Sequence, residues 1–262
     1  MIYVICMAVA FLACVIGKIC GMGGGVIIKP VLDALGVAST AAINFMSGCT
    51  VIGMSCWSVG KSVISKDSQI DWKLSTWLAI GAAIGGITGK QLYSSVAALF
   101  EDPNMAGAVQ AGCLLLATLA TMIYTIKKET IPSRHVTNPA ACLVIGLGLG
   151  LLGAFLGIGG GPFNMAVLFF FFSMPTKVAA QNSLYIILIS QTTGILKTVL
   201  SGKIPELIPV LLIAMVLCGI LGSEIGGRLN KHMDNKRTTK LFEGAMILVM
   251  LISCYNMVKY LV

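Results

Sequence analysis

Two glycine runs are the residues in this sequence whose types and spacing point most directly to chemistry. The chain reads GMGGG at 21–25 and GIGGG at 157–161, 136 positions apart, and both runs lie in very apolar sequence. Glycine leaves the backbone N–H groups at a helix start uncovered, and these groups, with the positive end of the helix dipole, attract anions. The runs predict an anion site whose backbone donors are Gly23, Gly24, Gly25, Gly159, Gly160 and Gly161.

Close packing between helices is the alternative role for these glycines. Small residues at intervals of four let two helix backbones approach each other in a membrane. Gly81, Gly85 and Gly89 have that spacing and are expected to pack in this way. Three adjacent glycines that recur at a fixed offset favour a binding site.

Uncharged polar side chains follow both glycine runs and would complete such a site. Ser47 and Ser183 are equivalent at the offset of 136, and side-chain amides lie close to both in the sequence. Hydroxyl and amide groups can donate hydrogen bonds to an oxyanion without adding charge. Hydrogen bonding between helices is the alternative role. The candidate side chains are Asn44, Ser47, Asn164, Gln181, Asn182, Ser183 and Gln191.

Charged residues inside apolar sequence are rare and informative. Lys29 and Asp33 lie four residues apart, on one face of a short apolar segment. Either they neutralise each other, or Lys29 supplies a positive charge for an anion. Glu224 and Arg228 have the same spacing near the end of a later segment, where an ion pair is the expected role.

The composition places the chain in a lipid bilayer. Of 262 residues, 57% are hydrophobic and 11% are charged, and the mean hydropathy is +0.93. A soluble domain would carry about 25% charged residues. The net charge of +8 comes from residues between apolar runs, which argues against a nucleic-acid surface. The nine cysteines form no C-x-x-C pair and are expected to be reduced packing residues.

No metal site, cofactor site or enzyme active site is expected. The two histidines, His135 and His232, lie in polar connections, and no H-E-x-x-H motif is present. A metalloprotease and a serine hydrolase therefore lack their essential histidines. The G-x-G-x-x-G at 148–153 lies in a charge-free apolar run without a βαβ pattern, which argues against a dinucleotide site.

Eight apolar stretches are long enough to cross a membrane as helices. The longest polar break, 127–138, divides the chain into a first transmembrane repeat, 1–126, and a second, 139–262, joined by a cytoplasmic linker. The expected spans are 2–18, 38–60, 73–94, 104–126, 139–157, 178–198, 206–228 and 241–260.

A short broken helix is expected after each glycine run. Residues 136–176 carry no charge, and as one helix of 41 residues they would be about 62 Å long. A hydrocarbon core is about 30 Å thick, so the chain must turn back near GIGGGP, and the returning helix covers about 162–174. Broken helices that start at equivalent motifs in two halves are typical of a transporter's central site.

The basic residues indicate how the two halves are oriented. If the short segments cross the membrane, the 18 Lys and Arg residues divide 13 to 5 between the two sides, and if they only dip in, 9 to 9. The uneven division is the expected one. The fold class is therefore an all-α polytopic membrane protein with two inverted repeats, each with four long spans and one short glycine-led helix. Both termini are expected to be extracytoplasmic.

These residues resemble the sulfite exporter TauE/SafE family. The resemblance covers nearly the whole chain and depends on GMGGG, GIGGGP, Gly36-Val37, Met174-Pro175 and Asn182-Ser183-Leu184. The first repeat departs from the family pattern at Asn44-Phe45-Met46-Ser47. The resemblance implies a secondary transporter of small sulfur- or carbon-containing anions, such as sulfite, sulfonates or sulfoacetate, in the bacterial plasma membrane.

The expected function is transport of a small anion by alternating access. The implied partners are the anion and the lipid bilayer, with protons as a candidate coupling ion and no nucleic acid. Two alternatives stay open at this point: a passive anion channel, and a non-transporting membrane enzyme or assembly subunit. The sequence leaves the identity of the anion, the direction of transport and the oligomeric state open.

Overall fold

The computed structural model describes residues 2–100, 103–128 and 130–261. All regular elements in these residues are α-helices, as the apolar runs predict. In chain order they are α1 (Ile2–Cys20), α2 (Gly25–Leu35), α3 (Thr40–Ile64), α4 (Trp72–Ala97), α5 (Pro103–Lys127), α6 (Pro139–Phe155), α7 (Gly161–Phe172), α8 (Thr176–Leu200), α9 (Pro209–Lys231) and α10 (Asn235–Leu261).

Six helices are long and apolar enough to cross a membrane. They are α1, α3, α5, α8, α9 and α10. The expected long spans at 73–94 and 139–157 are not among them. The first is α4, whose apolar character is diluted by glycine, serine and threonine. The second is α6, which ends after 17 residues because the chain enters the glycine turn.

Each glycine run turns the chain between two helices, as predicted. Gly21 and Gly23 have φ near +70°, and Gly157 and Gly159 have φ of +69° and +74°. A side chain rarely adopts this left-handed conformation, so glycine is the residue that suits these positions. The short helices that follow, α2 and α7, have 11 and 12 residues, and α7 lies where a helix over 162–174 was expected.

Two helix pairs pack through glycine. Gly81, Gly85 and Gly89 of α4 lie against the backbone of α6, where an added Cβ would come within 2.0–2.3 Å of a carbonyl oxygen. In α9, Gly222 and Gly226 lie against α1 in the same way, at 2.4 and 2.6 Å. The small-residue spacing therefore has the packing role expected for α4, and it brings α6 and its glycine turn beside the centre of the bundle.

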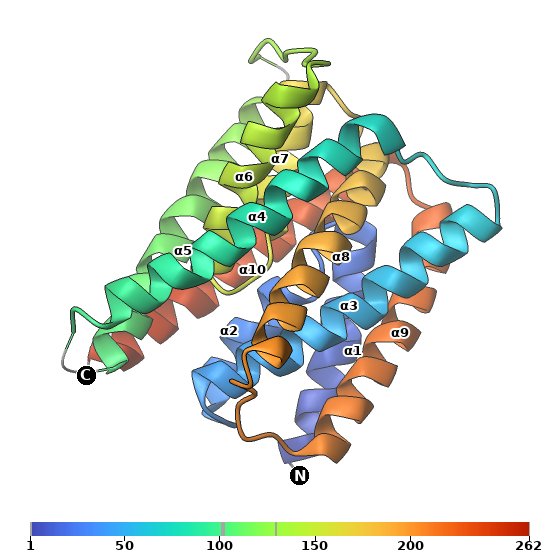
Figure 1. Ribbon diagram of the computed structural model, residues 1–262. Coiled ribbons are helices and arrows are strands. Elements are labelled where there is room, and N and C mark those ends of the chain that lie inside the picture. The colour runs from blue at the N-terminus through green and yellow to red at the C-terminus, as the bar shows by residue number, and fades with distance from the viewer. Residues whose placement is uncertain (1, 101–102, 129, 262) are drawn as a thin grey trace.

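The helices run between two ends of the bundle, and α3 and α8 cross next to each other in its middle (Figure 1). Both termini lie at one end, together with the connections from α2 to α3 and from α8 to α9 (Figure 1). The connections from α3 to α4, from α5 to α6 and from α9 to α10 lie at the other end. Nine free cysteines are dispersed among the helices, and the described residues contain no disulfide.

Candidate functional site

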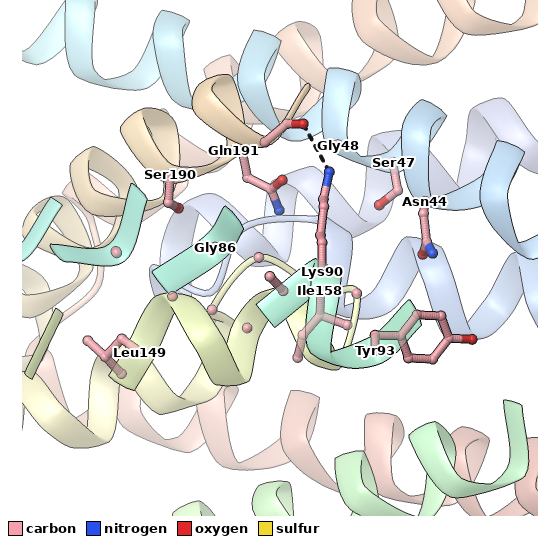
Figure 2. A pocket seen from close by; sticks show the side chains of 18 of the residues that line it. Asn44, Ser47, Gly48, Gly86, Lys90, Tyr93, Leu149, Ile158, Ser190 and Gln191 are labelled. Carbon is pink, nitrogen blue, oxygen red and sulfur yellow. Dashed lines mark hydrogen bonds between the residues drawn. The ribbon is translucent and has the colours of Figure 1, made fainter. Parts of the chain in front are cut away.

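A cavity of about 210 Å³ lies beside the second glycine turn. Its wall comes from α3, α4, α5, α6, α7 and α8, so residues far apart in the sequence meet there (Figure 2). The described residues that line it include no aspartate or glutamate. Its polar lining residues are Asn44, Ser47, Lys90, Tyr93, Ser94, Gln110, Asn164, Ser190 and Gln191.

The glycine turn at 157–160 forms one side of the cavity, called the cavity floor below, and polar side chains lie against it. A Cβ added at Gly159 would come within 1.7 Å of the Gln191 Nε2 atom. A Cβ added at Gly157 would come within 2.5 Å of the Lys29 Nζ and 3.0 Å of the Asn44 Oδ1. The bare backbone therefore lets side chains from α2, α3 and α8 reach one small surface, which no other residue type would permit.

The start of α7 faces this cavity without a side-chain cap. Its N-cap is Gly160, with φ of +114°, and Gly160 and Asn164 both line the cavity. The first N–H groups of any helix have no acceptor within that helix. The N–H of Gly159, in contrast, donates to the carbonyl of Gly153 at 3.1 Å. The donors that α7 can offer to an anion therefore begin at Gly160 and not at Gly159.

Lys29 is buried next to the cavity, and its ammonium group donates to residues other than Asp33. Its Nζ donates to the Gln110 Oε1 at 2.5 Å and to the Leu156 carbonyl at 3.1 Å. Among the described residues no ion pair joins Lys29 to Asp33. Of the two roles considered for Lys29, a direct i, i+4 ion pair is therefore not formed, because the Leu156 carbonyl after α6 and the Gln110 amide of α5 accept from the ammonium group.

Lys90 and Gln110 line the cavity and were not among the sequence candidates. The Lys90 Nζ donates to the Gly194 carbonyl at 3.0 Å, across the cavity from α4 to α8 (Figure 2). Lys90 follows Ala82 and Gly86 at intervals of four, so it shares a face with small residues. This spacing in the sequence could have identified Lys90 as a candidate site residue. Gln110 is a polar residue in an apolar run, which is a weaker indication of a site residue.

The first glycine run does not line this cavity. Gly23 faces Val51 and Ile187, and the Gly24 N–H donates to the Met54 Sδ at 3.3 Å. Gly25 lies closest to the site, where an added Cβ would be 3.2 Å from the Ser47 Oγ. The two runs therefore have equivalent turns in different surroundings.

Three other candidates lie between helices, away from the cavity. The Ser183 Oγ donates to the Gly21 carbonyl at 2.6 Å. Asn182 holds the connection between α3 and α4: its Oδ1 accepts from the Asp71 N–H and the Ser75 Oγ, and its Nδ2 donates to the Gln69 carbonyl. Gln181 accepts from the Gln69 N–H. These contacts correspond to the helix-bonding alternative.

A second cavity, of about 730 Å³, lies at the other end of α3 and α8. Six basic residues line it: Lys18, Lys61, Lys66, Lys177, Arg228 and Lys231. Glu224 is held there by Lys61 at 2.5 Å and by Arg228 at 2.8 Å, which confirms the expected ion pair and adds a partner. Gln181 also lines this cavity.

Two comparisons with known proteins found matches that cover most of the chain. Residues 6–253 match the family model described as Sulfite exporter TauE/SafE. The chain is also 25% identical over 272 residues to the "Probable membrane transporter protein YunE" of Bacillus subtilis (strain 168), covering 95% of this chain and 96% of that protein. No solved structure matches the chain.

Proposed function

The chain belongs to the sulfite exporter TauE/SafE family of membrane transporters, and on this premise we propose that it carries small oxyanions by alternating access. The membrane would be the bacterial plasma membrane. The family description names sulfite, and the resemblance stated above adds sulfonates to the substrate class that we propose. The observation that carries the proposal is the bare glycine turn at 157–160, against which Lys29, Asn44 and Gln191 converge.

The electrostatic character of the cavity supports an anionic substrate. Its lining combines one ammonium group, Lys90, with the hydroxyl and amide groups of Ser47, Asn164 and Gln191, and no carboxylate. The uncapped start of α7 adds a partial positive charge of about +0.5. A second ammonium group, on Lys29, lies behind Gly157. Such donors suit sulfite or sulfonate oxygens, which accept hydrogen bonds and bear negative charge.

Two cavities toward opposite ends of α3 and α8 support alternating access. The early residues of α3 and the late residues of α8 line the first cavity, and the other ends of the same helices line the second. Between them lie buried apolar side chains, including Val51, Met54 and Leu184, at most 1% exposed. We propose that α3 and α8 form the barrier and that its movement opens one cavity as it closes the other.

The packing of the helices supports two inverted repeats with boundaries at 1–126 and 139–262. In this arrangement α1 to α5 are equivalent to α6 to α10, in the same order. The pair α4/α6 is then equivalent to α9/α1, and the pair α3/α9 is equivalent to α8/α4. All four pairs are in contact. Gly17 and Gly153 are equivalent at the offset of 136. Each lies against the glycine turn of its own half, with an added Cβ 2.6 or 2.5 Å from a glycine nitrogen.

Counterflow in proteoliposomes tests the function. Purified protein is reconstituted with unlabelled anion inside, and uptake of labelled sulfite, thiosulfate, methanesulfonate or toluenesulfonate is followed over time. With the membrane potential held at zero by equal K⁺ on both sides and valinomycin, a carrier gives transient accumulation of label, which a passive channel cannot give. No flux of any of these anions above protein-free vesicles would support the enzyme or assembly-subunit alternative and overturn the proposal.

Cysteine labelling in intact cells tests the proposed sidedness, in which both termini are extracytoplasmic. Position 102, in the connection from α4 to α5, lies outside the described residues, so Lys203 serves as the outer position. In a variant without the native cysteines, Lys203→Cys should react with an impermeant maleimide, and Asp67→Cys and Asp234→Cys should be protected. Labelling of 67 and 203 from the same side would contradict the inverted arrangement.

A further inference from the structure

A small polar chamber lies between α2, α5 and α10, next to the proposed anion cavity. Its volume is about 20 Å³, and its polar lining consists of Lys29, Asp33, Gln110, Ser253, Asn256 and Tyr260. Ser253 and Asn256 are 1% and 4% exposed. Polar groups that are buried among apolar helices are costly unless they are paired, and in transporters they commonly mark ion or proton pathways.

Three buried oxygen atoms in the wall of this chamber have no hydrogen-bond partner. They are the Asp33 Oδ1, the Ser253 Oγ and the Asn256 Oδ1. A cavity needs about 10–15 Å³ to hold a water molecule, which also needs two to four polar partners. One water molecule fits the chamber: it would donate to Asp33 and Asn256 and accept from the Ser253 hydroxyl.

Lys29 and Gln110 connect the chamber to the anion cavity. Gln110 lines both, and its Oε1 accepts from the Lys29 Nζ at 2.5 Å. The same Nζ is the nearest atom to a Cβ built on Gly157, on the cavity floor. One ammonium group is thus placed between the half-buried Asp33, whose Oδ1 atom is buried, on one side and the proposed anion position on the other.

The chamber is polar in only one half of the chain. At the offset of 136, Lys29, Asp33 and Gln110 correspond to Met165, Phe169 and Met246, which are at most 5% exposed. The Phe169 ring packs edge-on against Phe242 at a centroid distance of 6.4 Å. Because apolar side chains pack well at the equivalent place, the fold itself does not require the buried charges of the first half.

We propose that this chamber is the proton site of an anion–proton symporter and that Asp33 binds the coupling proton. The proposal rests on the anion-carrier function above. With the anion site empty, the positive charge of the Lys29 ammonium, one turn away on α2, stabilises ionised Asp33 through space. A bound anion pairs with the same ammonium group, so the ammonium stabilises the Asp33 carboxylate less. Asp33 then takes one proton from the aqueous phase and becomes a neutral carboxylic acid. The reverse exchange releases anion and proton together on the other side.

The coupling is reciprocal, because any proton that raises the affinity for the anion is itself bound more tightly when the anion is present. Besides Lys29, the titratable groups that face Asp33 are Tyr93 on α4 and Lys259 and Tyr260 on α10. Lys259 is exposed and donates to the carbonyls of Asp33 and Ala34 at the end of α2, so it holds the helix end and not the carboxyl group.

Proton movement during anion uptake tests the proposal. Proteoliposomes with a trapped pH dye receive toluenesulfonate, which has no titrating group near neutral pH, or methanesulfonate, which has none either, if toluenesulfonate shows no counterflow. Wild-type protein should acidify the lumen as the anion enters. Asp33→Asn should abolish this acidification, because the amide cannot bind the coupling proton, and should keep anion counterflow, because the amide resembles the neutral carboxylic acid of the anion-bound state. Glu206→Gln, in the exposed connection from α8 to α9, is the matched acid-to-amide control.

A second variant covers the case in which Asp33→Asn does not fold. Ser253→Val fills the chamber and removes a hydroxyl that bonds the bridging water, so it should weaken acidification and keep counterflow. Three outcomes would each overturn the proton site. The wild type could show anion counterflow without acidification, the acidification could be equal in the wild type and both variants, or uptake could require Na⁺ in place of protons. If the wild-type protein shows no counterflow with any of the anions, the proposed function itself is overturned.

Discussion

The side-chain amide of Gln191 lies directly on the bare backbone of Gly159, so close that an added Cβ would come within 1.7 Å of the Nε2 atom. The amide comes from α8 and the glycine from the turn before α7. This contact ties a central helix of the bundle to the turn that forms the cavity floor. It also explains why glycine is needed there, since a larger residue would displace the amide from the cavity.

Gly160→Ala should abolish anion exchange. The residue has φ of +114°, and an added methyl group would be 2.8 Å from the Asn164 side-chain amide. Strained backbone of this kind costs about 1–3 kcal/mol. We expect an inserted protein without counterflow in proteoliposomes. Undiminished exchange by Gly160→Ala would remove the start of α7 from the anion site.

Gly24→Ala is the matched change in the first glycine run, and its effect should be on packing. Gly24 has a helical φ of −67°, but an added methyl group would meet the Cys14 Sγ at 2.6 Å. Adding Cys14→Ala removes that clash, so the double variant should recover the thermal stability and the counterflow of the wild type. Failure of Cys14→Ala to restore either property would point to a role for Gly24 beyond packing.

Lys90→Met should weaken anion binding by about tenfold or more, because hydrogen bonds to charged groups contribute about 1.5–3 kcal/mol. Lys90 is the cation in the wall of the cavity, and its Nζ is close enough to α8 to reach a bound oxyanion. Lys73→Met, an exposed position on the same helix, is the control. Thermal shift against increasing anion concentration measures both affinities. Equal affinities of the two variants would contradict a role for Lys90 in the site.

Asn182→Ala should lower the unfolding temperature and leave anion affinity unchanged. The Asn182 amide is fully buried and bonds Asp71, Ser75 and Gln69, and each partner left unsatisfied costs about 1–3 kcal/mol. Gln181→Ala loses one bond at an exposed site and should be milder. Scanning fluorimetry gives the unfolding temperatures. An Asn182→Ala protein of normal stability and weakened anion affinity would return this residue to the binding site.

Gly146→Ala and Gly148→Ala should have opposite effects, although both glycines lie in α6. A Cβ at Gly146 would be 2.2 Å from the Leu78 carbonyl oxygen, so α4 and α6 would have to separate. Gly148 has open space around it, and alanine is favoured over glycine in a helix by about 1 kcal/mol. We expect lower expression and a lower unfolding temperature for Gly146→Ala alone. Similar behaviour of the two variants would show that this close packing contributes little to stability.

The sequence by itself determined the solvent, the helical class and the positions of the two turns. These properties are local: hydropathy selects the bilayer, and only glycine readily adopts the left-handed φ of Gly21 and Gly157. The ion pair of Glu224 with Arg228 was also predictable, because both residues lie on one helix face. Each of these inferences needs only neighbours within a few residues along the chain.

Only the tertiary structure decided which residues meet at the cavity. The two glycine runs have the same sequence motif, but the second lies against polar groups and Gly23 of the first lies against Val51 and Ile187. Lys29 bonds Gln110, 81 positions away, and not Asp33 on its own helix. Partners of this kind depend on how distant helices pack, because side-chain contacts across a bundle are set by helix rotation and depth and not by spacing in the sequence.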